Sequence, residues 1–457
     1  MLSVFSVLLM LFLAYTILTV KPLFKQYKRI LLVVICVELL IPQGYFFKLG
    51  ASEVSFQLAL ECFLIPYTLY FIIKQHIRIR FFTLCVSLLF LITAMIGILH
   101  QYFEPHTGYI MNYDAVGNWD AYSIGINNKG TVKISWMRFL SIYVSFVTVI
   151  FTIWVFKYKI KHDDLKLMLS KVNKILKFNV CFVLIEFLLK NLFMSEGTLL
   201  LGKVLFGEGA NTYSELIIRN GIYQLQGITR EPSHLALTLF FTLVLFVIEK
   251  KILHCKFQIT SYIYIFSIVI IMYLSGSFAS LLYVMIFLVW CIYLYASYSN
   301  RYTKFILYSV VIFLLIYFTN ILYTGNVDSS SYLGRRIGMS TEMLLAVTSE
   351  DWQGMGGDSA LPRFLSIYET FSDFLSRPFF GMGVGIQISH GGIANILSDV
   401  GLIGVLLWLC VVFRYSKYDI KSLAILLLGS NILLSSGNLF GSVYIIFFIA
   451  CFRKYKY

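Results

Sequence analysis

A cation, a carboxylate and an imidazole lie together where an apolar run begins. In the stretch GITREPSHLALTLFF (227–241), Arg230, Glu231 and His234 surround a Pro-Ser pair, and the residues that follow are apolar. Arginine binds phosphate groups through paired hydrogen bonds, and a carboxylate or imidazole can take the proton of an attacking hydroxyl. The stretch raises the question of why such groups would lie together at the edge of what looks like a membrane span.

The composition defines the class of protein that must position this chemistry. Of the 457 residues, 59% are hydrophobic and 13% are charged, with 41 Phe and 31 Tyr. A soluble domain of this length is far less apolar, because its surface must be solvated. We therefore expect an all-α, polytopic integral membrane protein in which residues 1–457 form one transmembrane domain.

Apolar segments near the length of a membrane span recur along the whole chain. A helix needs about 20 apolar residues to cross roughly 30 Å of hydrocarbon. The sequence predicts about 12–14 transmembrane helices on this criterion. We place them at 2–20, 30–47, 54–73, 81–99, 136–156, 178–193, 235–248, 261–275, 278–298, 305–323, 400–413, 422–435 and 439–452.

The distribution of Lys and Arg predicts the orientation of these spans. Most of the 37 basic residues fall in alternate connections, which positive-inside behaviour places in the cytoplasm together with the C-terminus. These are 21–29, 74–80, 157–177, 249–260, 299–304, 414–421 and 453–457. The net charge of +14 is then a consequence of topology, so we expect membrane lipids rather than nucleic acid as partners. The Lys-rich stretch 157–177 predicts an interfacial helix.

Three long segments remain on the outer, extracytoplasmic side, at 100–135, 194–234 and 324–399. The largest is predicted to contain an amphipathic helix over 362–375, because its apolar residues recur at helical spacing. Gly381, Gly383 and Gly385 follow and predict a tight turn in which backbone can approach a ligand.

Other chemistries have no support in the sequence. It contains no GxxxxGK[ST], HExxH or GxSxG motif, and its eight cysteines all fall in predicted spans or inner connections. We expect no cofactor and no metal. Within the spans, Glu186 and Lys190 are spaced to form an ion pair one helical turn apart, and a structural or interfacial role is favoured for Glu186, Glu38 and Glu61.

The order of motifs from about residue 220 onward resembles the O-antigen polymerase and ligase superfamily of bacterial envelopes. The similar elements are REPSHLA (230–236), SGSFASLL (275–282) and the outer segment with DSSSYLGRRIG, then GGDSALPRFLSIYETFSDFLSRPFFGMGVG, then SHGGIANILSDVGLIGVLLWL. Ligases of that superfamily commonly have a Ser-Arg pair where this chain has Ser277 and Phe278, and His390 is followed by Gly391 rather than Asn. Both departures favour the polymerase branch.

The resemblance implies a glycosyltransferase at the outer face of the bacterial inner membrane. Its substrate would be an undecaprenyl-pyrophosphate-linked oligosaccharide, polymerised into a surface polysaccharide such as O-antigen or capsule, with a chain-length regulator as a further partner. The pyrophosphate leaving group needs cationic ligands, and the candidates are Arg219, Arg230, Arg335, Arg336 and Arg363. Glu231 and His390 are the candidate catalytic bases.

Plainer interpretations exist for the same residues. Arg335 and Arg336 could pair with acidic residues of their loop, Arg363 could extend to lipid headgroups, and His390 could hydrogen-bond the glycine turn. Arg377 is interpreted as structural. The alternative functions are a ligase that transfers glycan to an acceptor and a transporter of lipid-linked oligosaccharide.

Overall fold

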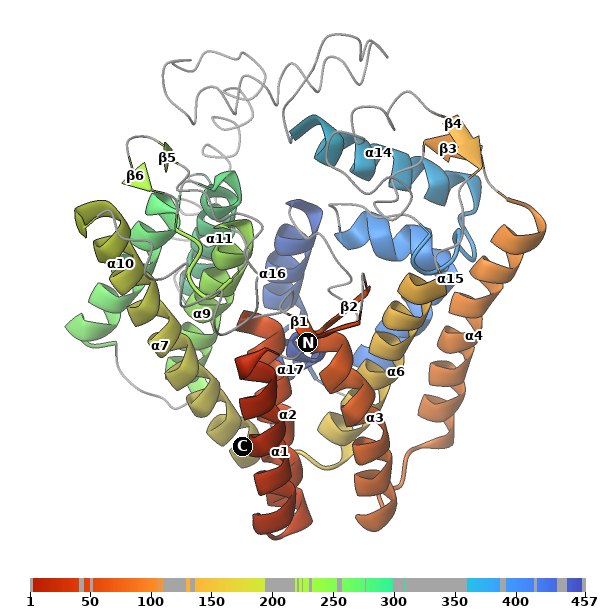
Figure 1. Cartoon of the computed structure of the whole chain (residues 1–457), viewed down its shortest axis with the longest axis horizontal. Helices are drawn as coiled ribbons and strands as arrows, with labels where there is room; N and C mark the ends of the chain where they lie inside the picture. The colour runs from red at the N-terminus through yellow and green to blue at the C-terminus, as the bar shows by residue number, and fades with distance from the viewer. Residues whose placement is uncertain are drawn as a thin grey trace.

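The structure is a computed structural model, and its described residues are mostly helical. They are 3–40, 45–49, 52–105, 107–109, 129–131, 136–193, 218–219, 222–223, 225–229, 232–252, 257–275, 277–298, 309, 360–386, 392–414, 417–433 and 442–453. Most of the helices run between two ends of a bundle, whereas α14 and the first part of α15 lie across the upper end in Figure 1. They are α1 (Val4–Thr19), α2 (Leu23–Leu40), α3 (Phe56–Lys74), α4 (Phe81–Phe103), α6 (Trp136–Tyr158), α7 (His162–Phe193), α9 (Pro232–Ile252), α10 (Ile259–Leu274), α11 (Phe278–Tyr298), α14 (Ala360–Ser376), α15 (Gly392–Phe413), α16 (Ile420–Leu433) and α17 (Val443–Cys451).

Among the residues that the structure describes, three short two-stranded antiparallel sheets supplement the helices, so the all-α prediction holds for the bundle but not for every connection. They pair β1 (Tyr45–Leu49) with β2 (Ser52–Ser55), β3 (Thr107–Tyr109) with β4 (Lys129–Thr131), and β5 (Ile218–Arg219) with β6 (Ile222–Tyr223). The register aligns Tyr45 with Ser55, Thr107 with Thr131 and Ile218 with Tyr223. The first hairpin also corrects the predicted span 30–47, because helix α2 begins earlier, at Leu23, and strand β1 already begins at Tyr45.

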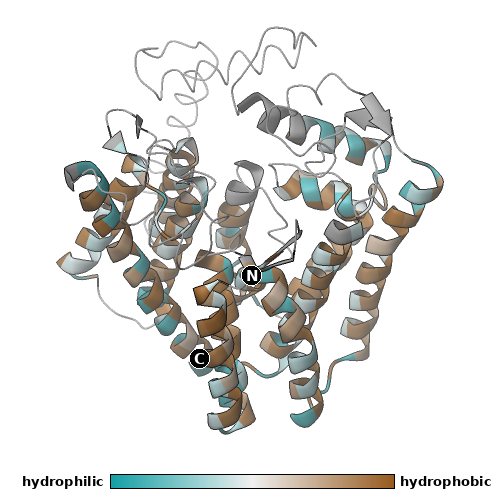
Figure 2. Ribbon diagram, in the orientation of Figure 1, coloured by the Kyte–Doolittle hydropathy of each residue, from teal (hydrophilic) through white to brown (hydrophobic). Residues whose placement is uncertain are grey.

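The apolar helices identify a membrane-embedded chain. Within the described ranges, five helices are long and apolar enough to cross a bilayer: α3, α4, α6 from Phe139, α11 from Ala279 to Ala296, and α15. Helices α1 and α10 are equally apolar but shorter. Figure 2 shows the upright helices mainly in hydrophobic colours, with hydrophilic residues toward their ends and on α14. The total of about 12–14 spans stays a prediction, and the span at 305–323 falls outside the described residues apart from position 309.

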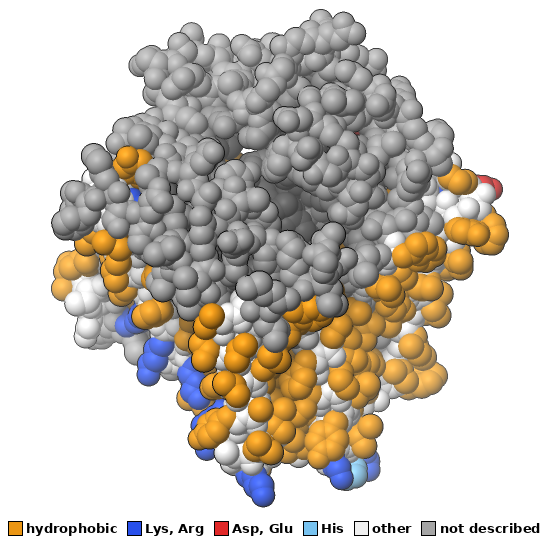
Figure 3. Space-filling model, in the orientation of Figure 1, with side chains coloured by type: hydrophobic (Ala, Val, Ile, Leu, Met, Phe, Trp, Pro, Cys, Tyr) orange, Lys and Arg blue, Asp and Glu red, His pale blue; other side chains and the backbone are white. Residues whose placement is uncertain are grey.

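The basic connections gather at one end of the bundle. Figure 3 shows Lys and Arg side chains at the lower end, below a broad hydrophobic surface. Several make specific contacts there: Lys28 Nζ lies 2.5 Å from Asp164 Oδ1, and the Arg414 guanidinium lies 3.4 Å from the centre of the Phe82 ring. The described parts of the three long outer segments lie toward the opposite end (Figure 1). Which end faces the cytoplasm stays a prediction.

Helix α7 corrects the predicted division between an interfacial helix at 157–177 and a span at 178–193. It is one continuous helix of 32 residues, His162–Phe193. Its sequence contains no Gly or Pro to interrupt it, and Leu165, Leu169, Val172 and Leu176 are buried against the bundle. The lysines of its first half occupy the remaining positions, so the polar pattern marks an exposed side of the helix rather than a separate element.

A pair of buried carboxyl groups joins four helices in the bundle. The Glu61 carboxyl of α3 accepts hydrogen bonds from Gln57 Nε2 (2.9 Å) and from Ser145 Oγ of α6 (2.6 Å). The Glu38 carboxyl of α2 accepts the backbone N–H of Tyr444 in α17 at 3.0 Å, and it lies close enough to Glu61 for the two carboxyl groups to interact electrostatically. Both residues are at most 1% exposed, and no Lys or Arg in the described ranges forms an ion pair with them. The structural role that the sequence favours for Glu38 and Glu61 agrees with these contacts.

The substitution Glu38→Leu should lower the thermal unfolding midpoint in detergent, because it leaves the buried Tyr444 N–H without an acceptor at a cost of about 1–3 kcal/mol. Glu61→Gln is the matched control, since its amide oxygen still accepts from Ser145 and the Tyr444 N–H keeps its acceptor, Glu38. We expect the control to stay close to the wild-type midpoint in a fluorescence-detected thermal scan. Equal midpoints for the two variants would contradict this account of the carboxyl pair.

Candidate functional site

The segment RPFFGMGVG forms a turn against the first part of α15, and its GMGVG part is buried. The six residues Gly381–Ile386, named the glycine turn below, are all buried. The backbone N–H of Met382 donates to Ser398 O at 2.6 Å, and the N–H of Gly385 donates to Asp399 Oδ1 at 3.1 Å. Two motifs that are separate in sequence are therefore joined by hydrogen bonds inside the protein.

The glycines allow this turn to touch the backbone of its neighbours. Gly381, Gly383 and Gly385 have φ values of +72°, +108° and +75°, which confirms the predicted tight turn. A Cβ on Gly383 would lie 2.7 Å from Ile98 N of α4, and a Cβ on Gly97 would lie 2.7 Å from Gly383 Cα. At Gly383, the close approach is therefore to the chain's own helix α4 rather than to a ligand.

A break in α15 completes the same unit. Gly401 has φ +64° and ψ −175°, so the helix is interrupted between its first and second parts. The N–H groups that follow the break are not left unpaired: Leu402 N donates to Pro378 O at 2.8 Å, and Ile403 N donates to Phe379 O at 3.1 Å. A Cβ at Gly401 would lie 2.4 Å from Phe379 O. The RPFFG and GLIG motifs thus form one packed structure.

Arg377 fastens this unit to α4. Its Nη1 donates to Gln101 Oε1 at 3.1 Å, and its Nη2 donates to Glu104 O. Partial burial lowers the pKa of the Arg377 guanidinium from its ordinary value, while the nearby carboxylates of Glu104 and Asp373 oppose that shift. These contacts agree with the structural role predicted for Arg377.

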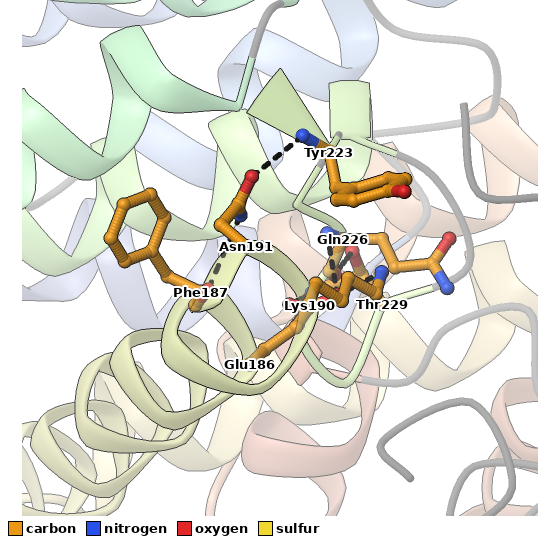
Figure 4. A network of polar contacts seen from close by, with 8 residues as sticks. Glu186, Phe187, Lys190, Asn191, Tyr223, Gln226 and Thr229 are labelled. Carbon is orange, nitrogen blue, oxygen red and sulfur yellow. Dashed lines mark hydrogen bonds and ion pairs between the residues drawn. The ribbon is translucent and has the colours of Figure 1, made fainter. Parts of the chain in front are cut away.

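The second segment of the candidate site, after the glycine turn, is the turn Leu225–Thr229, which ends immediately before Arg230 in the chain. It packs on the end of α7, as Figure 4 shows. The Glu186 carboxylate accepts the backbone N–H of Gly227 at 2.6 Å and that of Gln226 at 3.3 Å, and it binds Lys190 Nζ at 2.6 Å. The predicted Glu186–Lys190 pair is confirmed, and it also holds a segment 40 positions later.

The side-chain amide of Asn191, next to Lys190 on α7, makes a similar contact with strand β6. Asn191 Oδ1 accepts the backbone N–H of Tyr223 at 2.8 Å, while its Nδ2 donates to Phe187 O at 3.2 Å (Figure 4). Within the turn, Thr229 Oγ1 donates to Gln226 O at 2.6 Å. Helix α9 then begins at Pro232, a residue well suited to the first position of a helix because its missing N–H has no helical acceptor there.

The two predicted catalytic bases, Glu231 and His390, follow the turn Leu225–Thr229 and the glycine turn in the chain. Glu231, His390, Arg230, Arg335 and Arg336 lie outside the described residues. The two remaining candidates are placed through their backbones: Arg363 lies in the first turn of α14, and Arg219 lies in strand β5. Thr229 and Pro232 bracket the Arg230–Glu231 pair in the chain, and Ile386 and Gly392 bracket His390.

The glycine turn and the turn Leu225–Thr229 lie at the same end of the bundle, on either side of α16. This helix packs against α11 in the group that includes α7 and α9, and against α15 in the other group. Helix α14 crosses above the first part of α15 (Figure 1). The described elements therefore provide a framework for a site at this end, and the meeting of the predicted residues in one cavity stays a prediction.

Several contacts of this framework were not predicted from the sequence. Gly97 lies in an ordinary apolar span, and its packing against Gly383 has no local signal. Asp399 is a carboxylate next to an apolar run, which is a signal that could have been used. In the part of the chain that the structure describes, no group of three or more His, Cys, Asp or Glu residues is placed to hold a metal ion.

Comparisons with family models, with curated proteins and with solved structures found no match to this chain.

The substitutions Gly97→Ala and Gly383→Ala should each destabilise the protein, by about 1–3 kcal/mol, through the same backbone contact. Because they disrupt one contact from its two sides, we expect the double variant to cost clearly less than the sum of the single variants. Thermal unfolding of the four proteins of this cycle in detergent is the measurement. Strict additivity would show that the two glycines act independently.

Proposed function

We propose that this chain polymerises undecaprenyl-pyrophosphate-linked oligosaccharide repeat units into a bacterial surface polysaccharide. The observation that carries the proposal is the packing of RPFFGMGVG against the GLIG break of α15, directly beside the helix that contains Arg363. Two of the motifs on which the resemblance to the polymerases rests, RPFFGMGVG and GLIG, are thus parts of one packed unit. Such an arrangement supports a dedicated scaffold at the predicted extracytoplasmic end.

The proposed reaction transfers a growing glycan from its lipid carrier to a sugar hydroxyl of an incoming unit. The hydroxyl oxygen attacks the anomeric carbon, the bond from that carbon to the pyrophosphate oxygen breaks, and the hydroxyl proton passes to Glu231 or His390. The released pyrophosphate keeps the bonding electrons as negative charge. Arg363, with Arg335, Arg336, Arg230 and Arg219, is proposed to bind that charge.

Arginine is well suited to this role at the edge of a bilayer. Its guanidinium stays protonated at any accessible pH and donates paired hydrogen bonds to phosphate oxygens. The carrier's lipid chain would remain in the membrane beside the apolar helices, while its pyrophosphate would lie at the depth where α14 crosses the bundle (Figure 1). We propose that the bound, already activated sugar supplies the driving force, so that no cofactor takes part.

Polymerisation is tested by complementing a deletion strain with wild type or with Arg363→Ala, Arg336→Ala or Glu231→Ala and separating the surface polysaccharide on a gel. We expect single-repeat product from the deletion strain and from the variants, with loss of a general base alone lowering the rate by about 10²–10⁴-fold. Membrane levels of each variant are measured in parallel.

Arg377→Ala is the matched structural control, because this Arg binds α4 within the protein. It should lower the thermal unfolding midpoint, whereas Arg363→Ala should keep the wild-type midpoint and lose polymer. Long polymer that stays on the carrier in the deletion strain would instead indicate a ligase. Single repeats confined to the cytoplasmic leaflet would indicate a transporter.

A further inference from the structure

The Glu186 carboxylate is a point of convergence for three hydrogen-bond donors. It receives Lys190 Nζ and two consecutive backbone N–H groups, those of Gln226 and Gly227 (Figure 4). Glu186 is 1% exposed and Lys190 is 3% exposed. An ion pair this deeply buried is costly to desolvate and is retained where further hydrogen bonds satisfy it.

The two backbone donors distinguish this arrangement from a simple intrahelical pair. A Glu–Lys pair one turn apart on α7 needs no third partner, yet here the carboxylate also fixes a segment from another part of the chain. The turn is held tightly at this point: Gly227 has φ +62°, and a Cβ there would lie 2.9 Å from Val183 Cγ2 of α7 and 3.1 Å from Leu235 Cδ1 of α9. The turn therefore packs between α7 and α9.

This placement bears on the residues that follow in the sequence. The turn packs on α7 and α9 and ends at Thr229. Helix α9, which itself packs against α7, begins at Pro232. Only two positions of the chain, Arg230 and Glu231, separate them. Without the hydrogen bonds to Glu186, the turn that precedes Arg230 would be held less firmly, while α9, which follows Glu231, would stay in place.

We propose that Glu186, Lys190 and Asn191 are positioning residues for polymerisation, which hold the segment before α9 in the place that the reaction requires. This inference rests on the proposed function. Lys190 Nζ donates to the Glu186 carboxylate, Glu186 holds Gln226 and Gly227, and Asn191 holds Tyr223. None of the three is proposed to touch the substrate.

The test combines amide hydrogen exchange, measured by mass spectrometry on the purified full chain in detergent, with the polysaccharide gel. In Glu186→Gln, we expect peptides that cover 222–229 to exchange about tenfold faster or more, since a carboxylate that binds buried amides is lost. Polymer should shorten or disappear at unchanged membrane level. Asn191→Ala, which removes no charge, serves as the milder second variant and should produce the same changes to a smaller degree.

Glu249→Gln is the matched control. Glu249 also joins α7 to α9, by accepting Asn173 Nδ2 at 2.9 Å, but near the opposite end of these helices. It should leave exchange at 222–229 and polymer length unchanged. Unaltered exchange in Glu186→Gln would overturn the anchor, and faster exchange with normal polymer would overturn the positioning role.

The proposed function fails in a distinguishable way. If the chain is a ligase, the deletion strain still makes long polymer, and if it is a transporter, single repeats stay on the cytoplasmic leaflet, whatever the exchange rates show. A deletion strain that lacks polymer, together with Glu186→Gln protein that exchanges rapidly yet restores full-length polymer, rejects the positioning role alone.

Discussion

Backbone groups freed by the break at Gly401 must find partners inside a membrane protein, and this constraint organises the upper end of the bundle. An unpaired N–H in an apolar environment costs several kcal/mol, so irregular backbone at membrane depth is found where it is buried in protein. Here the carbonyls of Pro378 and Phe379 accept the N–H groups of Leu402 and Ile403. The break in α15 and the turn after α14 consequently depend on each other.

That dependence explains why small residues recur around the turn. Gly383 lies against Gly97 of α4, and Gly381 lies against the backbone of α15, at distances that no side chain could occupy. Arg377 then ties the start of the turn to the end of α4. On the other side of α16, a carboxylate performs the comparable task, because Glu186 satisfies the N–H groups of an irregular turn that has no strand or helix to pair with. Both segments lead directly into residues for which chemistry is proposed.

The sequence predicted the helical class and most helix positions because apolar length is a local property. The amphipathic helix α14 also follows from a local pattern and agrees with the structure, whereas α9 begins at Pro232, before the predicted start of its span at 235. The continuity of α7 was missed because its lysines suggested a surface helix, although no Gly or Pro separates its two halves. Contacts between distant positions, such as Glu38 with Tyr444 or Gly97 with Gly383, depend on how helices are rotated and shifted against each other, which one sequence does not reveal. For the candidate site, residue types and order could be predicted, but their distances could not.

The central claim, that this chain joins lipid-linked repeat units, is tested most directly by reconstitution. The purified protein would be placed in liposomes with lipid-linked repeat units extracted from the deletion strain, without nucleotide. The account predicts a ladder of polymer lengths together with released undecaprenyl pyrophosphate, as resolved by gel and mass spectrometry. Units that stay single with the purified chain, while wild-type membranes polymerise the same extract, would contradict it.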